Sequence, residues 1–450
     1  MTYIGLWKRL WSELLSGEEF GVKGRINIGL IGLGVIGSGV ARILAAKSDT
    51  ITKQVGTPLM LSKAADLDKA RKEQLPDPNI YTANAREILE DPEIDIVVEL
   101  IGKETPAHDY IREAIQRKKH VVTANKEVMA KHGPELLPLA AEHKVGLRYE
   151  ASVGGGIPLI APLKRNLQVN DISAIHTIIN GTTNYILTRM EKDGLEFSAA
   201  LKEAQALGYA EADPTSDIEG FDAAYKIAIL ATIAFRTDVR PEDVYHEGIS
   251  RLASQDFRYA KELGYAIKLL AIAKKEGVAV QARVHPAFVP NNMLLAKVDG
   301  VFNAVQIEGD LSDRVIFYGR GAGSEPTANV IVSDAIHLAQ NINLSISEKS
   351  ELPLDLPKLI KPMAEIETRC YIRMTIADQA GVLAQITKVL AENNISISSA
   401  IQKEVDNKSQ TAEIVIMTHP APEQAMQIAI GQIEQLEVVK EISNLVRVED

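Results

Sequence analysis

The chain has 450 residues, too many for one hydrophobic core, so its length predicts two to four domains. Apolar residues make up 46% and charged residues 24%, a balance that excludes disordered, collagen-like and disulfide-rich proteins. With 49 Lys plus Arg against 60 Asp plus Glu, the net charge of −11 disfavours nucleic acid as a principal partner. The single cysteine, Cys370, suits a reducing cytoplasm, and no apolar run reaches the roughly 18 residues of a transmembrane helix. We therefore expect a soluble cytoplasmic enzyme.

The first 24 residues form an N-terminal extension with an apolar stripe of helical spacing. The stripe holds both tryptophans of the chain, Trp7 and Trp11, together with Leu10, Leu14 and Leu15. It favours a short helix docked on the protein or on a neighbour, and a helix lying on a membrane surface is the alternative. A continuous apolar core and a small-residue cleavage site are both missing, so we expect no signal peptide.

Residues 25–150 alternate apolar runs with helical patterns at a spacing typical of a parallel sheet. The run 94–101 is almost wholly apolar, as a strand covered on both faces should be. Residues 47–57 are expected to be a loop insertion. The segment predicts a Rossmann-type doubly wound parallel sheet in an α/β domain, with strands at 26–31, 59–65, 94–101, 120–123 and 146–150 and helices at 37–46, 108–117 and 134–143.

The rest of the chain divides into four segments. Residues 151–318 form a long α+β stretch, and residues 319–344, a glycine-rich turn followed by a helical pattern, are expected to complete the first domain. Residues 345–369 contain prolines and charges and are predicted to be a linker. Residues 370–450 follow the order βαββαβ, which predicts a small ferredoxin-like sandwich.

A dinucleotide-binding motif begins the first domain. Gly32-Leu33-Gly34-Val35-Ile36-Gly37 is a GxGxxG that follows a predicted strand and opens a predicted helix. The first glycine permits a tight turn, the second lets backbone amides approach a pyrophosphate, and the third lets helix and strand pack closely. The anion would lie at the helix N-terminus, so the motif predicts a nicotinamide dinucleotide site.

The choice between NAD and NADP stays open. Asp66 ends the second predicted strand, where a carboxylate holds the ribose 2′-hydroxyl and favours NAD, although it lies farther along the chain than the usual spacing of about 20 residues. Four basic residues close to it in sequence could instead meet a 2′-phosphate, or could form a solvated surface: Lys63, Lys69, Arg71 and Lys72.

The most informative segment lies at residues 204–226. Asp222 and Lys226, four residues apart, share one face of a predicted helix that continues into an apolar run. Charged side chains cost free energy where a helix enters the interior, so their presence there favours a functional site. A lysine held among carboxylates can move a proton in an alcohol–carbonyl redox step, and the remaining acids can bind an ammonium group. The substrate implied is a small amino-bearing hydroxy compound, and the acids are Glu211, Asp213, Asp217, Glu219 and Asp222.

Two further segments are candidates for the same site. Lys126, in Thr-Ala-Asn-Lys at 123–126, lies just beyond a predicted strand, where open α/β sheets bind ligands; an exposed lysine at a helix start is the alternative. The turn Asn-Gly-Thr-Thr-Asn-Tyr at 180–185 can present hydroxyls and amides to a polar ligand, or can be a strand-to-helix cap.

At these residues the sequence resembles the homoserine dehydrogenase family. The segment from Gly208 to Lys226 matches the signature of that family at each constrained position. The segments at 123–126, 180–187 and 319–328 are also similar to family segments, so the resemblance covers about residues 25–340. It implies NAD(P)-dependent interconversion of L-homoserine and L-aspartate 4-semialdehyde in threonine, methionine and isoleucine biosynthesis, with dimerisation through the substrate domain at 151–318.

The resemblance also implies roles for individual residues. Lys226 would be the proton donor, and Lys126 a second essential lysine near substrate and nicotinamide. The substrate would contact Glu211, Asp222, Asp217, Thr182 and Tyr209, and the cofactor Gly208, Gly321 and Gly323. A monovalent cation, usually sodium in this family, would bind a strand-to-loop corner through Glu150, Val153, Gly155 and Ile157.

One departure from the family pattern is evident after the third predicted strand. The family tends to carry two glycines there, and this chain has Gly102 followed by Lys103. A lysine at this position could narrow the nicotinamide pocket or change its charge.

The C-terminal segment resembles an ACT domain, with Asp378, Gly381 and Val382 in its strand–turn–helix element. A glycine at a helix N-terminus is a suitable place for the carboxylate of an amino acid, so the resemblance implies feedback control by threonine. A pure oligomerisation module is the alternative, and ACT pairing would make the homo-oligomer larger than a dimer. Cys370 is expected to pack in the core.

Three other functions are less consistent with the sequence. Another ACT-bearing oxidoreductase, such as a phosphoglycerate dehydrogenase, would need an Arg/Glu/His arrangement that the sequence does not place. An aspartate-semialdehyde dehydrogenase needs a cysteine nucleophile in its central domain, and Cys370 lies outside that region. A non-catalytic amino-acid sensor is disfavoured by the presence of Lys126 and Lys226.

Overall fold

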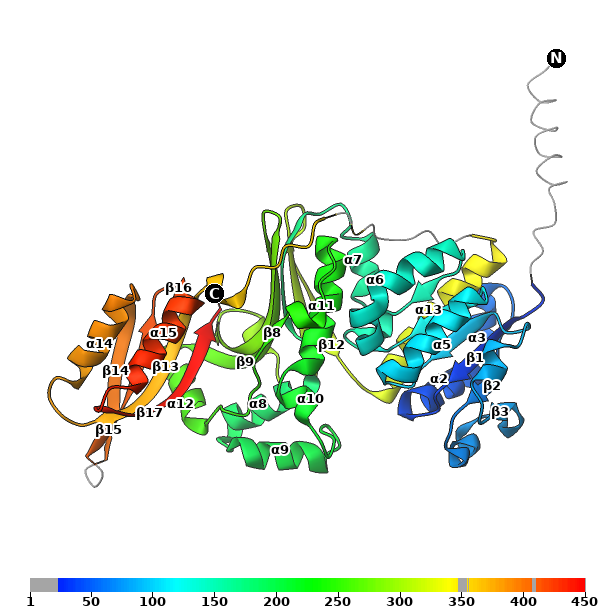
Figure 1. The fold of residues 1–450 in the computed structure, drawn as a ribbon. Coiled ribbons are helices and arrows are strands. Elements are labelled where there is room, and N and C mark those ends of the chain that lie inside the picture. The colour runs from blue at the N-terminus through cyan, green and yellow to red at the C-terminus, as the bar shows by residue number, and fades with distance from the viewer. Residues whose placement is uncertain (1–22, 347–353, 355, 407–409, 450) are drawn as a thin grey trace, which may run out of the picture. The chain divides into compact units, whose positions relative to one another are not determined.

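The computed structural model describes residues 23–346, 354, 356–406 and 410–449 (Figure 1). The apolar stripe predicted in the N-terminal extension lies outside these residues. The chain divides into two compact units. Unit 1 comprises Met1–Ala161 and Ala322–Pro353, and unit 2 comprises Pro162–Gly321 and Leu354–Asp450. No helix among the described residues is long and apolar enough to cross a membrane.

Unit 1 contains a six-stranded parallel sheet in the order β3-β2-β1-β4-β5-β6, which confirms the doubly wound fold (Figure 1). The central strand β1 is buried at each of its residues, as expected for a strand with helices on both faces. The strands are β1 (Ile26–Ile31), β2 (Leu59–Ala65), β3 (Tyr81–Thr82), β4 (Ile96–Glu99), β5 (His120–Thr123) and β6 (Leu147–Arg148).

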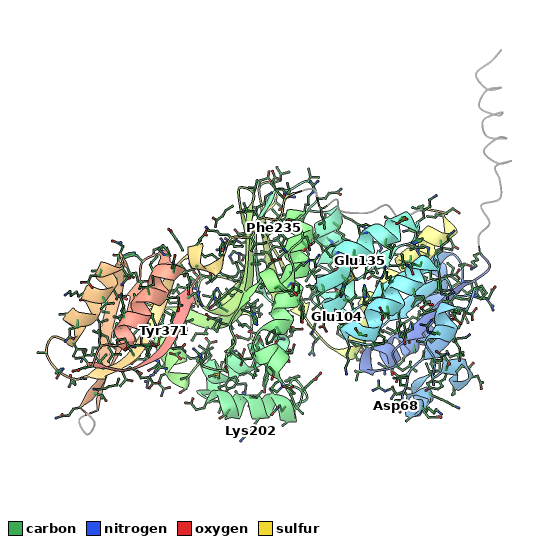
Figure 2. All side chains as sticks on the ribbon, in the orientation of Figure 1. Asp68, Glu104, Glu135, Lys202, Phe235 and Tyr371 are labelled. Carbon is green, nitrogen blue, oxygen red and sulfur yellow. The ribbon has the colours of Figure 1, made fainter. Side chains whose placement is uncertain are left out.

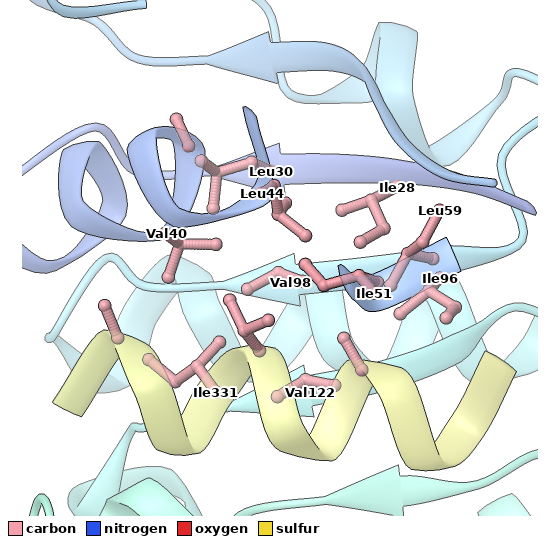
Figure 3. Packing of buried hydrophobic residues seen from close by; sticks show 14 of the residues in the cluster. Ile28, Leu30, Val40, Leu44, Ile51, Leu59, Ile96, Val98, Val122 and Ile331 are labelled. Carbon is pink, nitrogen blue, oxygen red and sulfur yellow. The ribbon is translucent and has the colours of Figure 1, made fainter. Parts of the chain in front are cut away.

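One apolar core of unit 1 lies where α2, α3 and α13 pack against the sheet. Figure 3 shows Leu30, Val98 and Val122 of the sheet packed with Val40 of α2 and Ile331 of α13. The helix from residues 324–343 therefore completes the domain that begins at β1. The helices of the unit are α2 (Val35–Ala46), α3 (Ser48–Val55), α4 (Arg86–Leu89), α5 (Glu104–Gln116), α6 (Lys126–Glu142) and α13 (Ser324–Asn343), with α7 (Ile160–Arg165) crossing its boundary; 3-10 turns lie at η1 (Lys69–Gln74), η2 (Pro78–Ile80) and η3 (Glu150–Ser152).

The expected loop insertion at residues 47–57 is wrong, because the structure places α3 there. Ile51 and Val55, four residues apart, are the two buried side chains of this helix, and Gly56 at φ +85° ends it. A helix that buries so few residues gives a weak apolar period in the sequence. Helix α6 also begins eight residues before the predicted helix, directly at Lys126.

Unit 2 is built on one eleven-stranded sheet, with the path β12-β11-β7-β9-β10-β17-β13-β15-β14 and with β8 and β16 pairing at its edges. The strands are β7 (Ile172–Ile178), β8 (Tyr245–His246), β9 (Tyr265–Glu276), β10 (Ala279–Pro290), β11 (Phe302–Gly309), β12 (Asp313–Arg320), β13 (Glu367–Ala377), β14 (Ile397–Asp406), β15 (Thr411–Thr418), β16 (Ala421–Pro422) and β17 (Val439–Val448). The helices are α8 (Gly181–Asp193), α9 (Phe197–Ala206), α10 (Thr215–Ile218), α11 (Phe221–Phe235), α12 (Ser254–Leu263), α14 (Val382–Glu392) and α15 (Glu423–Glu434); 3-10 turns lie at η4 (Pro241–Asp243), η5 (Leu295–Lys297) and η6 (Met363–Glu365).

The C-terminal part of unit 2 is the predicted βαββαβ sandwich, with strand order β17-β13-β15-β14 and α14 and α15 over its apolar core. Cys370 belongs to that core, and burial raises the pKa of its thiol to about 12, so the thiol packs rather than reacts. Strand β17 also pairs in parallel with β10, Ala287 opposite Arg447 and Phe288 opposite Val448. The small sandwich is therefore continuous with the sheet of the central domain.

Buried arginines fix this junction. The guanidinium of Arg447, 1% exposed, donates Nε to Glu423 (3.0 Å) and Nη1 to Glu247 (2.8 Å). Its Nη2 donates to both carboxylates again, at 2.6 Å and 3.0 Å. Arg373 of β13 likewise donates Nε to Asp256 of α12 at 2.7 Å. Each arginine joins the C-terminal sandwich to a segment of the central domain.

Candidate active site

The glycine-rich loop of unit 1 has the tight geometry that its motif predicts. Gly32 lies at φ +100°, and a Cβ there would come within 2.7 Å of the Leu100 carbonyl oxygen. A Cβ on Gly37 would lie 2.0 Å from the Gly32 carbonyl oxygen. Gly34 precedes α2 and supplies no side-chain cap, so the amides of Val35 and Ile36 open the helix at a terminus suited to an anion.

Asp66 lies directly after β2 and holds this loop. Its Oδ2 accepts the Leu33 amide at 2.7 Å. Of the four basic residues that the sequence offers, Arg71 lies closest to the loop: its Nη1 is 3.8 Å from Asp66 Oδ2 and would lie 3.2 Å from a Cβ on Gly34. Lys63 instead pairs with Asp91 at 3.0 Å. The structure therefore brings both a carboxylate and a guanidinium to the loop.

A buried carboxylate links the two loops that follow β4 and β5. Glu99, fully buried, accepts the Ile101 amide at 2.6 Å and the Thr123 hydroxyl at 2.7 Å, and burial raises its pKa. Thr123 Oγ1 in turn accepts the amide of Asn125 at 3.0 Å. Asn125 caps α6 through the Val128 amide. This chain of hydrogen bonds fixes the backbone from which the next residue, Lys126, projects.

Sequence reasoning missed Glu99, although it is one of two acids, with Asp95, within the mostly apolar run 94–101, and this was a usable signal. The neighbouring loop bears the family departure. Gly102 lies at φ +82°. Lys103 after it is exposed, and its carbonyl oxygen accepts a hydrogen bond from Asn125 Nδ2 at 2.9 Å. Lys103 is thus tied by its backbone to the segment that carries Lys126.

The corner predicted to hold a cation is built around Glu150. Its carboxylate, 7% exposed, accepts the backbone amides of Leu159, Ile160 and Ala161. A carboxylate has about four acceptor positions, so three amides leave one position for another ligand. Gly154 and Gly155, at φ +73° and +53°, turn the backbone so that the segment with Val153 and Ile157 closes on the same corner.

The acid–lysine segment of unit 2 forms a compact cluster. Gly220 at φ +85° ends the turn from α10 and begins α11, which places Asp222 in the first turn and Lys226 in the second. Asp222, 2% exposed, accepts Lys226 Nζ at 2.6 Å. Lys226 also donates to the Ile179 carbonyl at 3.1 Å and keeps 13% of its side chain exposed. The lysine is therefore held on two sides and reaches the surface by its end.

Asn180 ties a second acid to the cluster. Its Nδ2 donates to Asp217 at 2.7 Å and to Asp222 at 2.8 Å, and its Oδ1 accepts the Thr183 amide and caps α8. The turn at 180–185 is thus a helix cap, as one of the two alternatives from sequence has it, and its first residue also binds two acids of the cluster. The side chain of Asn180 was not singled out from sequence, because its partners lie 37 and 42 residues farther along the chain.

The remaining predicted substrate residues line the segment after α9. Thr182 donates its hydroxyl to the Tyr209 carbonyl at 2.7 Å, and the Tyr209 ring is 44% exposed. Gly208 at φ +74° turns the chain before it, and Glu211 lies exposed just beyond. The backbone carbonyl of Glu211 accepts Gln205 Nε2 at 3.1 Å, and its carboxylate lies on an exposed residue.

An unexpected buried amide lies beside two of the predicted glycines. Asn303 of β11 is 1% exposed, and neither its Oδ1 nor its Nδ2 has a hydrogen-bond partner. A Cβ on Gly321 would meet Asn303 Nδ2 at 1.8 Å, and one on Gly181 would lie 3.6 Å from Asn303 Oδ1. Gly323, at φ +130°, precedes α13 in unit 1. Nothing in the local sequence distinguishes Asn303, because its environment comes from three distant segments.

The predicted effector turn lies at the start of α14. Gly381 at φ +91° precedes the helix, no side chain caps it, and a Cβ there would meet nothing within 4 Å. Val382 is buried in the sandwich core, whereas Asp378 is exposed and its amide donates to the Gln410 carbonyl. The turn is open enough to admit a small ligand.

These features define a class of enzyme. A parallel sheet with a GxGxxG loop binds a nicotinamide dinucleotide, and a mostly buried lysine paired with a buried carboxylate suits proton transfer during hydride transfer. The molecule is thus a dinucleotide-dependent oxidoreductase with a small C-terminal domain.

The particular family follows from comparison with known proteins. The model of the homoserine dehydrogenase domain matches residues 158–336, that of the homoserine dehydrogenase NAD-binding domain residues 32–150, and that of the ACT domain residues 371–438. The homoserine dehydrogenase of Neisseria gonorrhoeae is 42% identical over 94% of this chain and 98% of its own. The chain belongs to the homoserine dehydrogenase family.

Solved structures agree with this assignment. A homoserine dehydrogenase from Thiobacillus denitrificans superposes with a TM-score of 0.89 at 42% identity, covering 95% of this chain and 98% of that chain. A hyperthermophilic archaeal homoserine dehydrogenase in complex with NADPH superposes with a TM-score of 0.60 at 28% identity, covering 71% of this chain and 98% of that one.

Proposed function

We propose that this chain interconverts L-homoserine and L-aspartate 4-semialdehyde, with Lys226 moving the proton of the reacting oxygen. The observation that carries the proposal is the Asp222–Lys226 pair, 2.6 Å apart where α11 enters the core. When bound, the nicotinamide dinucleotide accepts the hydride that leaves the alcohol carbon. In the reduction of the aldehyde, the protonated Lys226 Nζ gives its proton to the carbonyl oxygen as the hydride arrives. In the oxidation, the neutral amine takes the hydroxyl proton, so that direction requires Lys226 to release its own proton first.

Asp222, Asp217 and Glu211 are the proposed groups for the substrate ammonium. Asp222 and Asp217 are held side by side by Asn180, so their negative charge is fixed in one place before substrate arrives. Glu211 is exposed and can close on the ammonium from outside. Thr182 and Tyr209, joined by a hydrogen bond, are the proposed polar contacts to the rest of the substrate. Lys126, at the start of α6, is proposed as a second lysine near substrate and nicotinamide.

For the cofactor we propose NADP, with Arg71 as the group that contacts the 2′-phosphate. Arg71 lies beside Asp66 and Gly34, and a guanidinium binds phosphate in two-pronged geometry. The archaeal relative crystallised with NADPH is consistent with this choice. Because a hydrogen bond to a charged group is worth about 1.5–3 kcal/mol, Arg71→Ala should raise the KM for NADP roughly ten-fold or more and leave that for NAD unchanged. An equal effect on both cofactors would remove the assignment.

A sodium ion is proposed at the Glu150 corner. Carboxylate and carbonyl oxygens suit a hard cation, and the ligands would be Glu150 and the backbone of Val153, Gly155 and Ile157. The three amides on Glu150 fix its orientation, so the ion would stabilise the turn rather than take part in the redox step. Replacing sodium by choline in the buffer should lower the melting temperature, and Glu150→Gln should abolish that difference. A melting temperature independent of the cation contradicts the site.

Threonine is the proposed effector, bound by its carboxylate at the uncapped start of α14 near Gly381. The open space at Gly381 and the exposed Asp378, which can accept an ammonium, support this assignment. Asp378→Ala should weaken threonine inhibition at least ten-fold without changing kcat for homoserine. Unchanged inhibition would move the effector site elsewhere, and an absence of inhibition in the wild type would leave the ACT domain as an assembly module.

The central experiment is a homoserine oxidation assay with NAD and NADP in turn, with and without threonine. We expect reduction of the nicotinamide that depends on L-homoserine, is faster with NADP, and falls when threonine is added. Homoserine that fails to support turnover with either cofactor would overturn the proposed reaction.

A further inference from the structure

A cluster of metal-ligating side chains lies in unit 1, away from the glycine-rich loop. His132 and Glu135 are three residues apart on α6 and share one face, and His108 faces them from α5. One ligand atom from each of the three lies within 4.8 Å of the others. Figure 2 labels Glu135 and Glu104, which mark these two helices. The spacing matches sites in which facing helices supply inward ligands three residues apart.

His108 supplies a nitrogen that no protein group satisfies. Its Nε2 is buried and has no hydrogen-bond partner, while its Nδ1 lies 3.6 Å from the carboxylate of Asp109. The two imidazole rings are stacked, with centroids 4.1 Å apart. A buried ring nitrogen without a partner is unfavourable, and a metal ion between the rings and Glu135 would satisfy it.

His132 is already oriented as a metal-ligating histidine usually is. Its Nε2 is 2.8 Å from Glu104 Oε1, an arrangement that assigns the Nε2 proton to this hydrogen bond and leaves Nδ1 as the donor atom for a metal. Lys131 binds the other Glu104 oxygen at 2.7 Å.

The charged side chains around the cluster do not prevent a metal ion from binding to it. Lys131 is held by Glu104 and by Glu127 at 2.8 Å. Arg112 Nε lies 3.8 Å from Glu135, and both side chains are about half exposed, so this contact is weak and a metal ion can replace it. The acids Glu104, Asp109 and Glu135 outnumber the two nearby cations, a balance that favours a divalent ion.

We propose that His108, His132 and Glu135 bind a divalent transition-metal ion such as Zn²⁺ or Co²⁺, with Glu104 as the outer carboxylate behind His132. Two imidazole nitrogens and one carboxylate oxygen suit zinc, cobalt or nickel and are a poor set for Mg²⁺ or Ca²⁺. The ion joins α5 to α6, the helix that begins at Lys126. The three ligands belong to unit 1, and none of them is among the residues proposed to bind substrate or cofactor.

The test uses the untagged full-length protein, stripped with chelator and titrated with CoCl2 and then with ZnCl2. We expect one Co²⁺ per chain with visible absorption bands, displaced by an equal amount of Zn²⁺. His108→Ala is the first variant, because Nε2 makes no hydrogen bond that its removal would break. It should weaken binding at least ten-fold, as should His132→Ala, and Glu104→Gln should weaken it by about ten-fold through His132.

The matched control is His143→Ala, which removes a histidine at the end of the same helix. It should leave Co²⁺ binding unchanged. Binding that is absent at 100-fold excess of metal over about 1 μM protein, or that survives both His108→Ala and His132→Ala, overturns the proposal. Homoserine turnover is not the readout, so a failure here is distinct from a failure of the proposed reaction.

Discussion

Unit 2 contains two clusters of buried charge that differ in one respect. Around Arg447, both acids bind the same buried guanidinium, Glu423 from inside the core and Glu247 with part of its side chain exposed. Around Lys226, one lysine meets one buried acid, and further carboxylates face outward. Arginine keeps its proton at every pH of interest, whereas lysine can release one. The arginine cluster therefore suits a structural role between the two domains, whereas the lysine cluster suits substrate binding and proton transfer.

The largest expected effect comes from removing the lysine side chain of this cluster. Lys226→Ala removes the proposed proton-transfer group, so kcat for homoserine oxidation should fall by about 10²- to 10⁴-fold. NADPH binding, followed by fluorescence, should stay within a few-fold because the glycine-rich loop belongs to unit 1. Lys226→Arg keeps the charge but cannot give up the proton, and it should be as inactive as the alanine variant. Near-wild-type turnover in either variant would remove Lys226 from the mechanism.

Breaking the arginine cluster should act on stability rather than chemistry. Arg447→Met leaves the buried Glu423 and the partly exposed Glu247 without their partner, and breaking a buried ion pair costs about 3–5 kcal/mol of unfolding free energy. Urea denaturation measures the loss. Adding Glu247→Gln and Glu423→Gln removes the stranded charges and should recover most of it. A single variant as stable as the wild type would show that the cluster does not hold the C-terminal sandwich.

A third variant separates stability from activity at one residue. Asn303→Leu keeps the branching at Cγ and removes two buried polar atoms that have no partner, each of which costs about 1–3 kcal/mol. The melting temperature should stay equal or rise, while kcat/KM for homoserine falls about ten-fold because the amide between Gly181 and Gly321 is lost. Asn343→Leu in α13 is the control and should leave kcat/KM unchanged. An unchanged kcat/KM in Asn303→Leu would show that the unpaired amide has no role in turnover.

The smallest expected effect is the pH response of His285, a fully buried residue of β10 whose Nε2 accepts Arg283 Nε at 3.1 Å. Burial first, then Arg447 and Arg283, lower the pKa of His285 to about 3, against about 6.5 when unfolded. Between these two pKa values the unfolded chain binds a proton that the folded chain does not. The contribution of His285 to the unfolding free energy is therefore fully present above about pH 6.5, and it decreases by up to about 1.4 kcal/mol for each unit by which the pH is lowered. His285→Gln should reduce the drop in melting temperature between pH 7 and pH 5. An unchanged drop would assign it to other groups, such as His176.

Features that depend on neighbouring residues were predictable from the sequence. The GxGxxG turn, the Asp222–Lys226 pair and the order of the C-terminal strands follow from local spacing, and the structure has each of them. Helix α3 was missed because two buried residues give too weak a period.

Features that join distant segments were not predictable in the same way. Asn180 meets its acids only after the chain has folded through α8, α9 and α10, and the isolation of Asn303 depends on β11 and two separate turns. The pairing of β17 with β10 joins strands about 160 residues apart by two residue pairs, which no sequence period specifies.

That pairing has a consequence for any shortened form of the enzyme. A chain ending near residue 365 would lose β17 and bare the backbone of β10 at Ala287 and Phe288, both now fully buried. An exposed, apolar strand edge recruits other chains, so aggregation is the expected outcome. Loss of activity in such a truncated chain would then reflect aggregation, so the substitution at Asp378 is the better test of the proposed threonine control.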